Sequence, residues 1–233
     1  MSKRDEIIDG HQSHLAYGLI YTEVLGWVDL GHAQGTDIKK LLQMIDDGER
    51  SGKERYDITY SQSMVDSTRT LKMGKYVTWR IKSGRGDKER KRIALGMMMM
   101  TARKFEALQA SFPVSLITDS GFSGEDLVSD LLGFYRVATI IPPFKMLRPV
   151  SKGEALKRWD YYGKIGNWKN DTFTPLLFPD PAKYLGARPR KGVLPTFMTS
   201  ITPWTDFSSD VVNITCVDGS YIDKVKQGFF PYA

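Results

Sequence analysis

The sequence of 233 residues contains one cysteine, Cys216, and three histidines. A single cysteine excludes an internal disulfide and any metal site that is built from several cysteines. No apolar run approaches the roughly 20 residues of a membrane-spanning helix, and the charged start of the chain lacks the apolar core of a signal peptide. We therefore expect synthesis in the cytoplasm without a signal peptide, and any export would use a specialised secretion system.

The sequence also lacks internal repeats, low-complexity tracts and an obvious linker. These absences predict a single domain over residues 1–233, with a motif-bearing core at 1–141 and an irregular, proline- and aromatic-rich part at 142–233. A hydrophobic content of 41% is sufficient for a sizeable core. The net charge of +6 favours acidic partners such as nucleic acid, anionic lipid or an anionic cell-wall polymer.

The stretch from Thr118 to Arg136 combines a helix start with several reactive side chains. Ser123 is a typical N-cap, and Asp126, three residues later, could complete a capping box. The apolar residues that follow recur at helical spacing and predict one buried face. The N-terminus of such a helix suits an anion, an oxyanion or a nucleophile that must lose a proton. The alternative is that Ser123 only caps the helix.

His32 lies at a predicted junction between a strand and a helix. The segment 19–30 is rich in β-branched and aromatic residues and predicts one or two strands that end at Asp29 and His32. Glycines flank His32, and Thr36 then begins a short helix. Loops at the ends of rigid elements often carry chemistry, so His32 is a candidate functional residue. A histidine in a glycine-rich turn can equally have a structural role.

The fold class that these patterns predict is α+β, with an antiparallel sheet packed against two main helices. Alternating polar and apolar residues predict antiparallel strands at 55–67 and 72–82. Segregated helices and hairpin-connected strands argue against a doubly wound parallel sheet. The strands are expected at 19–30, 55–67, 72–82, 136–141 and 196–217, and the main helices at 88–110 and 123–136.

Three segments carry a resemblance to known proteins: GWVDLGHAQGTD, DITYSQSM and SGFSGEDLVSDLLGFY. They resemble a large uncharacterised bacterial family that has the segments GG-x-[IV]-D-x-x-H and S-x-F-S-x-E-D-L-x-S-N-L-L-G. The resemblance covers roughly residues 26–138, and the chain departs from it at Asp130, where the family pattern has asparagine. The resemblance supplies a grouping and no mechanism.

A weaker resemblance is to circularly permuted NlpC-type papain-like hydrolases. In that fold the strand that bears the histidine comes first, and a nucleophilic cysteine opens a later helix. The resemblance implies that His32 is the base and that the strand with Gln62 supplies a polar orienting group. The expected cysteine is absent, which leaves Ser123 as a substituted nucleophile, Cys216 as an alternative nucleophile from elsewhere in the chain, or an inactive site.

The first functional hypothesis is a hydrolase of amide or ester bonds in the cell envelope, with peptidoglycan as the expected polymer. Ser123 would be the nucleophile, His32 the base, and Asp29 or Asp37 would orient the imidazole as in other triads. By analogy with envelope-cleaving toxins passed between bacteria, the chain would be a secreted antibacterial effector. The expected partners are an anionic cell-wall polymer or its peptide as substrate and an immunity or delivery protein; no cofactor and no nucleic acid are expected. Further site-lining residues are Gln62, Ser120, Glu125 and Asp126.

Two further hypotheses come from other classes. A metal-dependent hydrolase would use His32, Asp37, Glu125 and Asp126 as ligands, although the spacing of His32 and Asp37 matches no standard zinc motif. A non-catalytic protein would bind a partner or an anionic polymer through a basic surface and the C-terminal third. The hydrolase hypothesis makes a geometric prediction, that His32 lies near the N-terminus of the helix that begins at Ser123.

Overall fold

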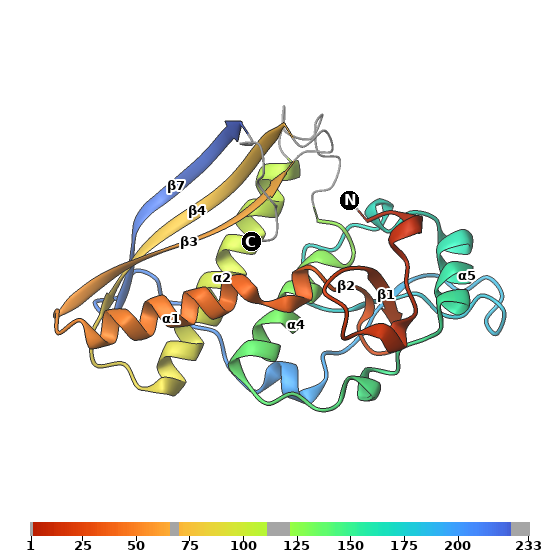
Figure 1. Cartoon of the computed structure of the whole chain (residues 1–233), viewed down its shortest axis with the longest axis horizontal. Helices are drawn as coiled ribbons and strands as arrows, with labels where there is room; N and C mark the ends of the chain where they lie inside the picture. The colour runs from red at the N-terminus through yellow and green to blue at the C-terminus, as the bar shows by residue number, and fades with distance from the viewer. Residues whose placement is uncertain (1, 66–69, 111–121, 225–233) are drawn as a thin grey trace. The chain divides into compact units, whose positions relative to one another are not determined.

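The computed structural model describes residues 2–65, 70–110 and 122–224, except for the side chains of 217 and 218, and its fold class is α+β (Figure 1). The chain divides into two compact units. Unit 1 comprises Met1–Gly35 and Asp119–Ser200, and unit 2 comprises Thr36–Thr118 and Ile201–Ala233. The single domain expected over residues 1–233 stays a prediction. No helix in the described ranges is long and apolar enough to cross a membrane.

Unit 1 contains a small sheet with the strand order β1-β2-β5-β6 and two α-helices. The first two strands form an antiparallel hairpin, to which β5 adds in parallel. The strands are β1 Leu19–Thr22, β2 Gly26–Asp29, β5 Leu176–Leu177 and β6 Arg190–Lys191; the α-helices are α4 Asp126–Ala138 and α5 Lys152–Tyr162; the 3-10 helices are η1 Arg4–Glu6, η2 Gly10–Gln12, η3 His32–Gln34, η4 Phe144–Leu147, η5 Ile165–Asn167 and η6 Thr196–Thr199.

Aromatic side chains from β1, β2 and α5 form one core of unit 1. Tyr21 and Trp27 meet edge to face with ring centroids 5.2 Å apart, and Trp27 meets Trp159 in the same way at 5.8 Å. All three residues are buried, together with Phe178. Edge-to-face pairs of this kind stabilise a core beyond the burial of their area. This core therefore holds α5 against the β1–β2 hairpin.

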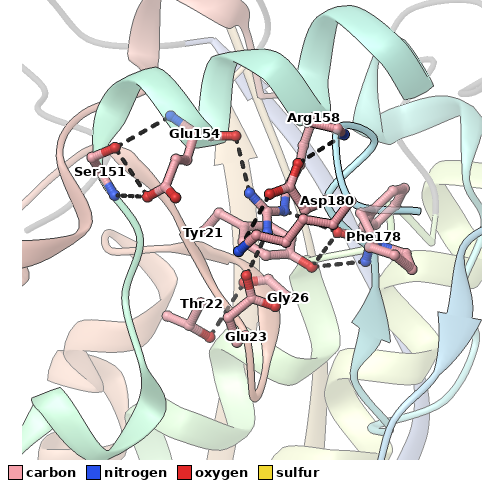
Figure 2. Close-up of polar contacts among 12 residues, drawn as sticks. Tyr21, Thr22, Glu23, Gly26, Ser151, Glu154, Arg158, Phe178 and Asp180 are labelled. Atoms are coloured by element: carbon pink, nitrogen blue, oxygen red, sulfur yellow. Dashed lines mark hydrogen bonds and ion pairs between the residues drawn. The ribbon is translucent and has the colours of Figure 1, made fainter. Parts of the chain in front are cut away.

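Arg158 of α5 is buried beside this core, where its guanidinium group joins three segments (Figure 2). Its Nε donates to the carbonyl oxygen of Phe178 over 3.0 Å, and its terminal nitrogen pairs with the carboxylate of Glu23. The guanidinium carbon lies 4.6 Å from the centroid of the Tyr21 ring. The charge is thus compensated by hydrogen bonds and by an aromatic face, as a buried arginine requires.

Within its described residues, unit 2 has a three-stranded antiparallel sheet with the order β3-β4-β7 and two α-helices. The pairing of β3 with β4 is regular from Arg55↔Lys82 to Val65↔Lys72, which confirms the two predicted strands. The pairing of β4 with β7 shifts register between Tyr76 and Trp79. The elements are α1 Thr36–Arg50, β3 Arg55–Val65, β4 Leu71–Lys82, α2 Asp87–Ala110 and β7 Val212–Lys224.

The predicted alternation along β3 and β4 is confirmed. Tyr56, Ile58 and Tyr60 are buried on the face of the sheet that packs against α1 and α2, and their neighbours on β3 are exposed. Trp79 of β4 is buried on the same face, opposite Ile58. Because side chains alternate along a strand, the second face of this sheet carries the polar residues.

Several predicted boundaries are wrong. Helix α4 begins at Asp126 with Glu125 as its N-cap residue, so Ser123 lies in the turn before the helix and does not cap it. The strand expected at 136–141 is absent, because α4 continues to Ala138 and buries that residue. Apolar residues near a helix end resemble a short buried strand, and the prolines that follow stop either element.

The C-terminal strand prediction is confirmed only in its second half. The segment Thr196–Thr199 is a 3-10 helix, and β7 starts at Val212. The dipeptide DG at 218–219 is a typical turn signal, but both residues lie inside β7, where Gly219 pairs with Tyr76. One expected sheet is thus two separate sheets. The pairing partner of a strand depends on distant residues, which local patterns do not specify.

Candidate functional site

The candidate site lies in unit 1, where η3 packs onto α4. The chain leaves β2 at Asp29, and Gly35 ends η3 in a left-handed conformation with φ of 67°. Gly133 of α4 allows close contact, because a Cβ atom there would lie 2.7 Å from the carbonyl oxygen of His32. Arg136, one turn later, donates to the carbonyl oxygen of Ala33 over 2.9 Å. These contacts hold η3 against the C-terminal half of α4.

His32 forms an ion pair with Asp130. The distance from Nδ1 of His32 to Oδ1 of Asp130 is 2.9 Å, and the side chains are 40% and 11% exposed, respectively. Burial of the imidazole opposes its charge, but the carboxylates of Asp130, Asp29 and Asp126 outweigh that effect and raise the pKa of His32 well above 6.5. The ion pair with Asp130 therefore favours the protonated imidazole of His32. Its Nε2 makes no hydrogen bond with any residue that the structure describes.

Asp29 connects β2 to both η3 and α4. Its Oδ1 accepts hydrogen bonds from the backbone nitrogens of Gly31, over 2.7 Å, and His32, over 3.4 Å. Its own backbone nitrogen donates to the hydroxyl of Ser129 over 3.0 Å. Residues of the GWVDLGH segment thus contact residues of the SGEDLVSD segment. The sequence of either segment does not indicate that the other is its partner.

Ser123 and Glu125 form a buried pair in the turn before α4. The hydroxyl of Ser123 donates to one carboxylate oxygen of Glu125 over 2.5 Å, and the hydroxyl of Ser2 donates to the other over 2.6 Å. Ser123 is 1% exposed and Glu125 is fully buried. The structure therefore joins Ser123 to Glu125 and joins His32 to Asp130, and it does not join Ser123 to His32.

Three of the predicted site residues belong to unit 2. The carboxylate of Asp37 accepts a hydrogen bond from the hydroxyl of Tyr60, and Gln62 lies next to the same hydroxyl on β3. Cys216 is half-buried in β7, opposite Thr78. Asp126 is in the first turn of α4, and Ser120 lies outside the described residues.

Two residues of the site escaped prediction from the sequence. Asp130 holds the imidazole, and Ser129 links α4 to β2. A signal for Asp130 existed, since it is the position at which the chain departs from the family pattern that it resembles. In the part of the chain that the structure describes, no group of three histidine, cysteine or acidic side chains is arranged to hold a metal ion.

A hollow in the described part of the chain does not coincide with these residues. It has a volume of about 740 Å³ and lies in unit 2, between the C-terminal half of α1 and the first residues of β3. Met44, Tyr56 and Arg80 are among its lining residues, and none of the predicted site residues lines it.

Comparison with known proteins leaves the site to be judged on geometry alone. No protein-family model matches the chain. No curated protein and no solved structure is significantly similar to it. The two resemblances described above therefore stay predictions.

Proposed function

We propose that this chain is a hydrolase of amide or ester bonds in which His32 and Asp130 form the catalytic pair. The observation that carries the proposal is the 2.9 Å contact from Nδ1 to a less exposed carboxylate, which leaves Nε2 without a partner among the described residues. In histidine-dependent hydrolases a buried carboxylate orients the imidazole through Nδ1, and Nε2 serves the reaction. Ser123 is bonded to Glu125 and is given no role as nucleophile in this proposal.

Water is the nucleophile in the proposed reaction, and His32 is a general acid. As water adds to the carbonyl carbon, it transfers one proton to Asp29, whose Oδ2 makes no hydrogen bond with the described residues. The bond to the leaving nitrogen or oxygen then breaks, and the leaving group takes the proton from Nε2 of His32. Solvent returns a proton from Asp29 to His32. A general acid and a general base that act together need different pKa values. The raised pKa of His32 favours its role as the acid beside the carboxylate of Asp29.

The proposed substrate is a peptide of the bacterial cell envelope, and the chain would act as an exported effector. The net charge of +6 supports this setting, because cell-wall polymers are anionic. The permuted papain-like fold is part of the proposal. Its support is the order of elements, since the strand β2 that delivers His32 precedes the helix α4 that holds it.

The test is hydrolysis of purified peptidoglycan and its stem peptides by the full chain, with new amino groups and product masses as the readout. We expect His32→Asn and Asp29→Asn each to reduce the rate by about 10² to 10⁴. His11→Asn is a matched control, because His11 pairs with Asp9 through Nδ1 at 2.8 Å in the same unit but is 68% exposed. Absence of hydrolysis by the wild type, or equal rates for the wild type and His32→Asn, would contradict the proposal.

A further inference from the structure

The outer face of the β3-β4-β7 sheet in unit 2 carries two tyrosines that neither the site nor the proposed reaction uses. Tyr76 of β4 and Tyr221 of β7 are neighbours on this face, and their ring centroids are 6.5 Å apart with an angle of 34° between the ring planes. Both rings are half-buried. They therefore present a continuous aromatic surface beside the polar residues of β3.

Each tyrosine ring lies flat across a glycine of the adjacent strand. Gly219 pairs with Tyr76, and Gly74 pairs with Tyr221. A Cβ atom on Gly74 would be 2.6 Å from Cζ and Oη of Tyr221 and 2.7 Å from its Cε1. The phenol end of Tyr221 therefore lies over Gly74, and the ring of Tyr76 lies over Gly219, where the corresponding distances are 2.3 to 2.5 Å. One ring face covers the backbone, so the other is directed away from the sheet.

Hydroxyl groups surround the two rings. Ser61 and Ser63 of β3 are exposed and lie in the same cross-strand rows as Tyr76 and Gly74, respectively. The phenol oxygens of Tyr76 and Tyr221 have no hydrogen-bond partner within the described part of the chain. We call the group of Tyr76, Tyr221, Ser61 and Ser63 the tyrosine platform. It offers both flat apolar surface and hydrogen-bonding groups that a ligand could use.

The charges on this face are paired across strands. Arg80 binds Asp57 through two hydrogen bonds of 2.8 and 2.9 Å. Arg80 lies four residues along β4 from Tyr76, on the same face of the sheet. At the other end Lys72 lies opposite Asp223 in the register of β4 and β7. The described side chains between these two ends of the face are uncharged, which suits an uncharged ligand better than a phosphate backbone.

We propose that the tyrosine platform binds an uncharged glycan, a chain of hexose or N-acetylhexosamine units. The apolar C–H face of a sugar ring would lie on each tyrosine, and its hydroxyl or amide groups would bond to the serines and to the phenol oxygens. Two rings at 6.5 Å correspond to contacts with successive sugars. The platform belongs to unit 2 and the His32 pair to unit 1, so binding does not depend on the proposed hydrolysis.

The test is calorimetric titration of the full chain with chitopentaose. We expect Tyr221→Ala and Tyr76→Leu each to weaken binding about tenfold, since either change removes one aromatic face. Tyr76→Leu keeps apolar cover over Gly219, and circular dichroism with thermal unfolding verifies that both variants fold. Tyr184→Ala is the control, because Tyr184 is 61% exposed in unit 1 and should not affect binding.

Binding that is insensitive to salt and weakened by both tyrosine variants supports the proposal. Absence of chitopentaose binding by the wild type overturns it, as does equal binding by the folded variants. Tighter binding of single-stranded oligothymidine that weakens steeply with salt and requires the tyrosines would also overturn it in favour of nucleic acid. His32→Asn should retain chitopentaose binding in full, so failure of the hydrolase proposal and failure of the glycan proposal are distinguishable.

Discussion

His32 and Asp130 are 98 residues apart in the sequence, and their side chains meet at 2.9 Å. The contact joins the start of η3 to the second turn of α4. It turns two separate polar segments into one site, and it brings the carboxylates of Asp29 and Asp126 within electrostatic reach of the imidazole. The charge state of His32 is therefore a property of the folded chain that experiments can follow.

The first prediction concerns stability and pH. The pKa of His32 is raised in the folded protein from an unfolded value near 6.5, so the folded state binds the proton more tightly. The stabilisation is complete below about pH 6.5 and is lost as the pH rises through the raised pKa. We expect Asp130→Asn to be less stable than the wild type at pH 6, and the difference to shrink at alkaline pH. Urea unfolding at several pH values measures it.

Asp171→Asn is the control for this prediction, because Asp171 is exposed in the same unit. Its stability should remain parallel to that of the wild type above pH 6. A difference between Asp130→Asn and the wild type that grows with pH would contradict the assignment of a raised pKa to His32.

The second prediction concerns the packing of η3 on α4. A Cβ atom at Gly133 would lie 2.7 Å from the His32 carbonyl oxygen and 3.1 Å from the Gly35 nitrogen, both of which are backbone atoms. Gly133→Ala should force η3 away from α4, destabilise the protein by about 1 to 3 kcal/mol and shift the pKa of His32 toward its ordinary value. Urea unfolding and NMR titration of His32 measure these effects.

Gly153→Ala is the matched exchange in helix α5. A Cβ atom there would meet nothing closer than the Ser151 hydroxyl at 4.0 Å, so this variant should be more stable by about 0.5 to 1 kcal/mol. Equal changes in the free energy of unfolding for Gly133→Ala and Gly153→Ala would contradict the prediction that the close contact of η3 with Gly133 stabilises the protein.

The third prediction concerns the buried carboxylate of Glu125. It accepts hydrogen bonds from Ser2 and Ser123 with separate oxygens. Glutamine has one oxygen and one NH₂ group at these positions, so Glu125→Gln leaves one hydroxyl facing a second donor and should cost about 1 to 3 kcal/mol of stability. Asp5→Asn makes the same chemical change at an exposed site of the unit and should be neutral within error in urea unfolding.

The fourth prediction concerns Arg158, which is 2% exposed. Arg158→Met keeps much of the apolar volume but removes the donors to Phe178 and Glu23, so we expect a loss of about 3 kcal/mol in the free energy of unfolding. The stability of Arg158→Lys should lie between those of the wild type and Arg158→Met, because an ammonium group keeps the charge but does not present the planar fork of a guanidinium group. Lys157→Met, at the exposed neighbouring position, is the control, and an equal loss there would refute the role of the network.

Local patterns were sufficient for the long regular elements. The helix expected at 88–110 is α2 Asp87–Ala110, and the strands expected at 55–67 and 72–82 are Arg55–Val65 and Leu71–Lys82. Ser151 and Glu154 have the spacing of a capping box and form one before α5. These features are encoded within a few residues, since helical spacing, strand alternation and capping act over one or two turns.

The sequence by itself determined the α+β class, the alternation of β3 and β4 and the candidacy of His32, because each depends on neighbours in the chain. Only the tertiary structure decided the partners: Asp130 for His32, Glu125 for Ser123, and β7 for β4. A side chain's partner and its charge state depend on which distant segments pack together and which groups lose water. Both the partner and the charge state depend on burial and electrostatic interactions between residues far apart in the sequence, which a local sequence pattern does not specify.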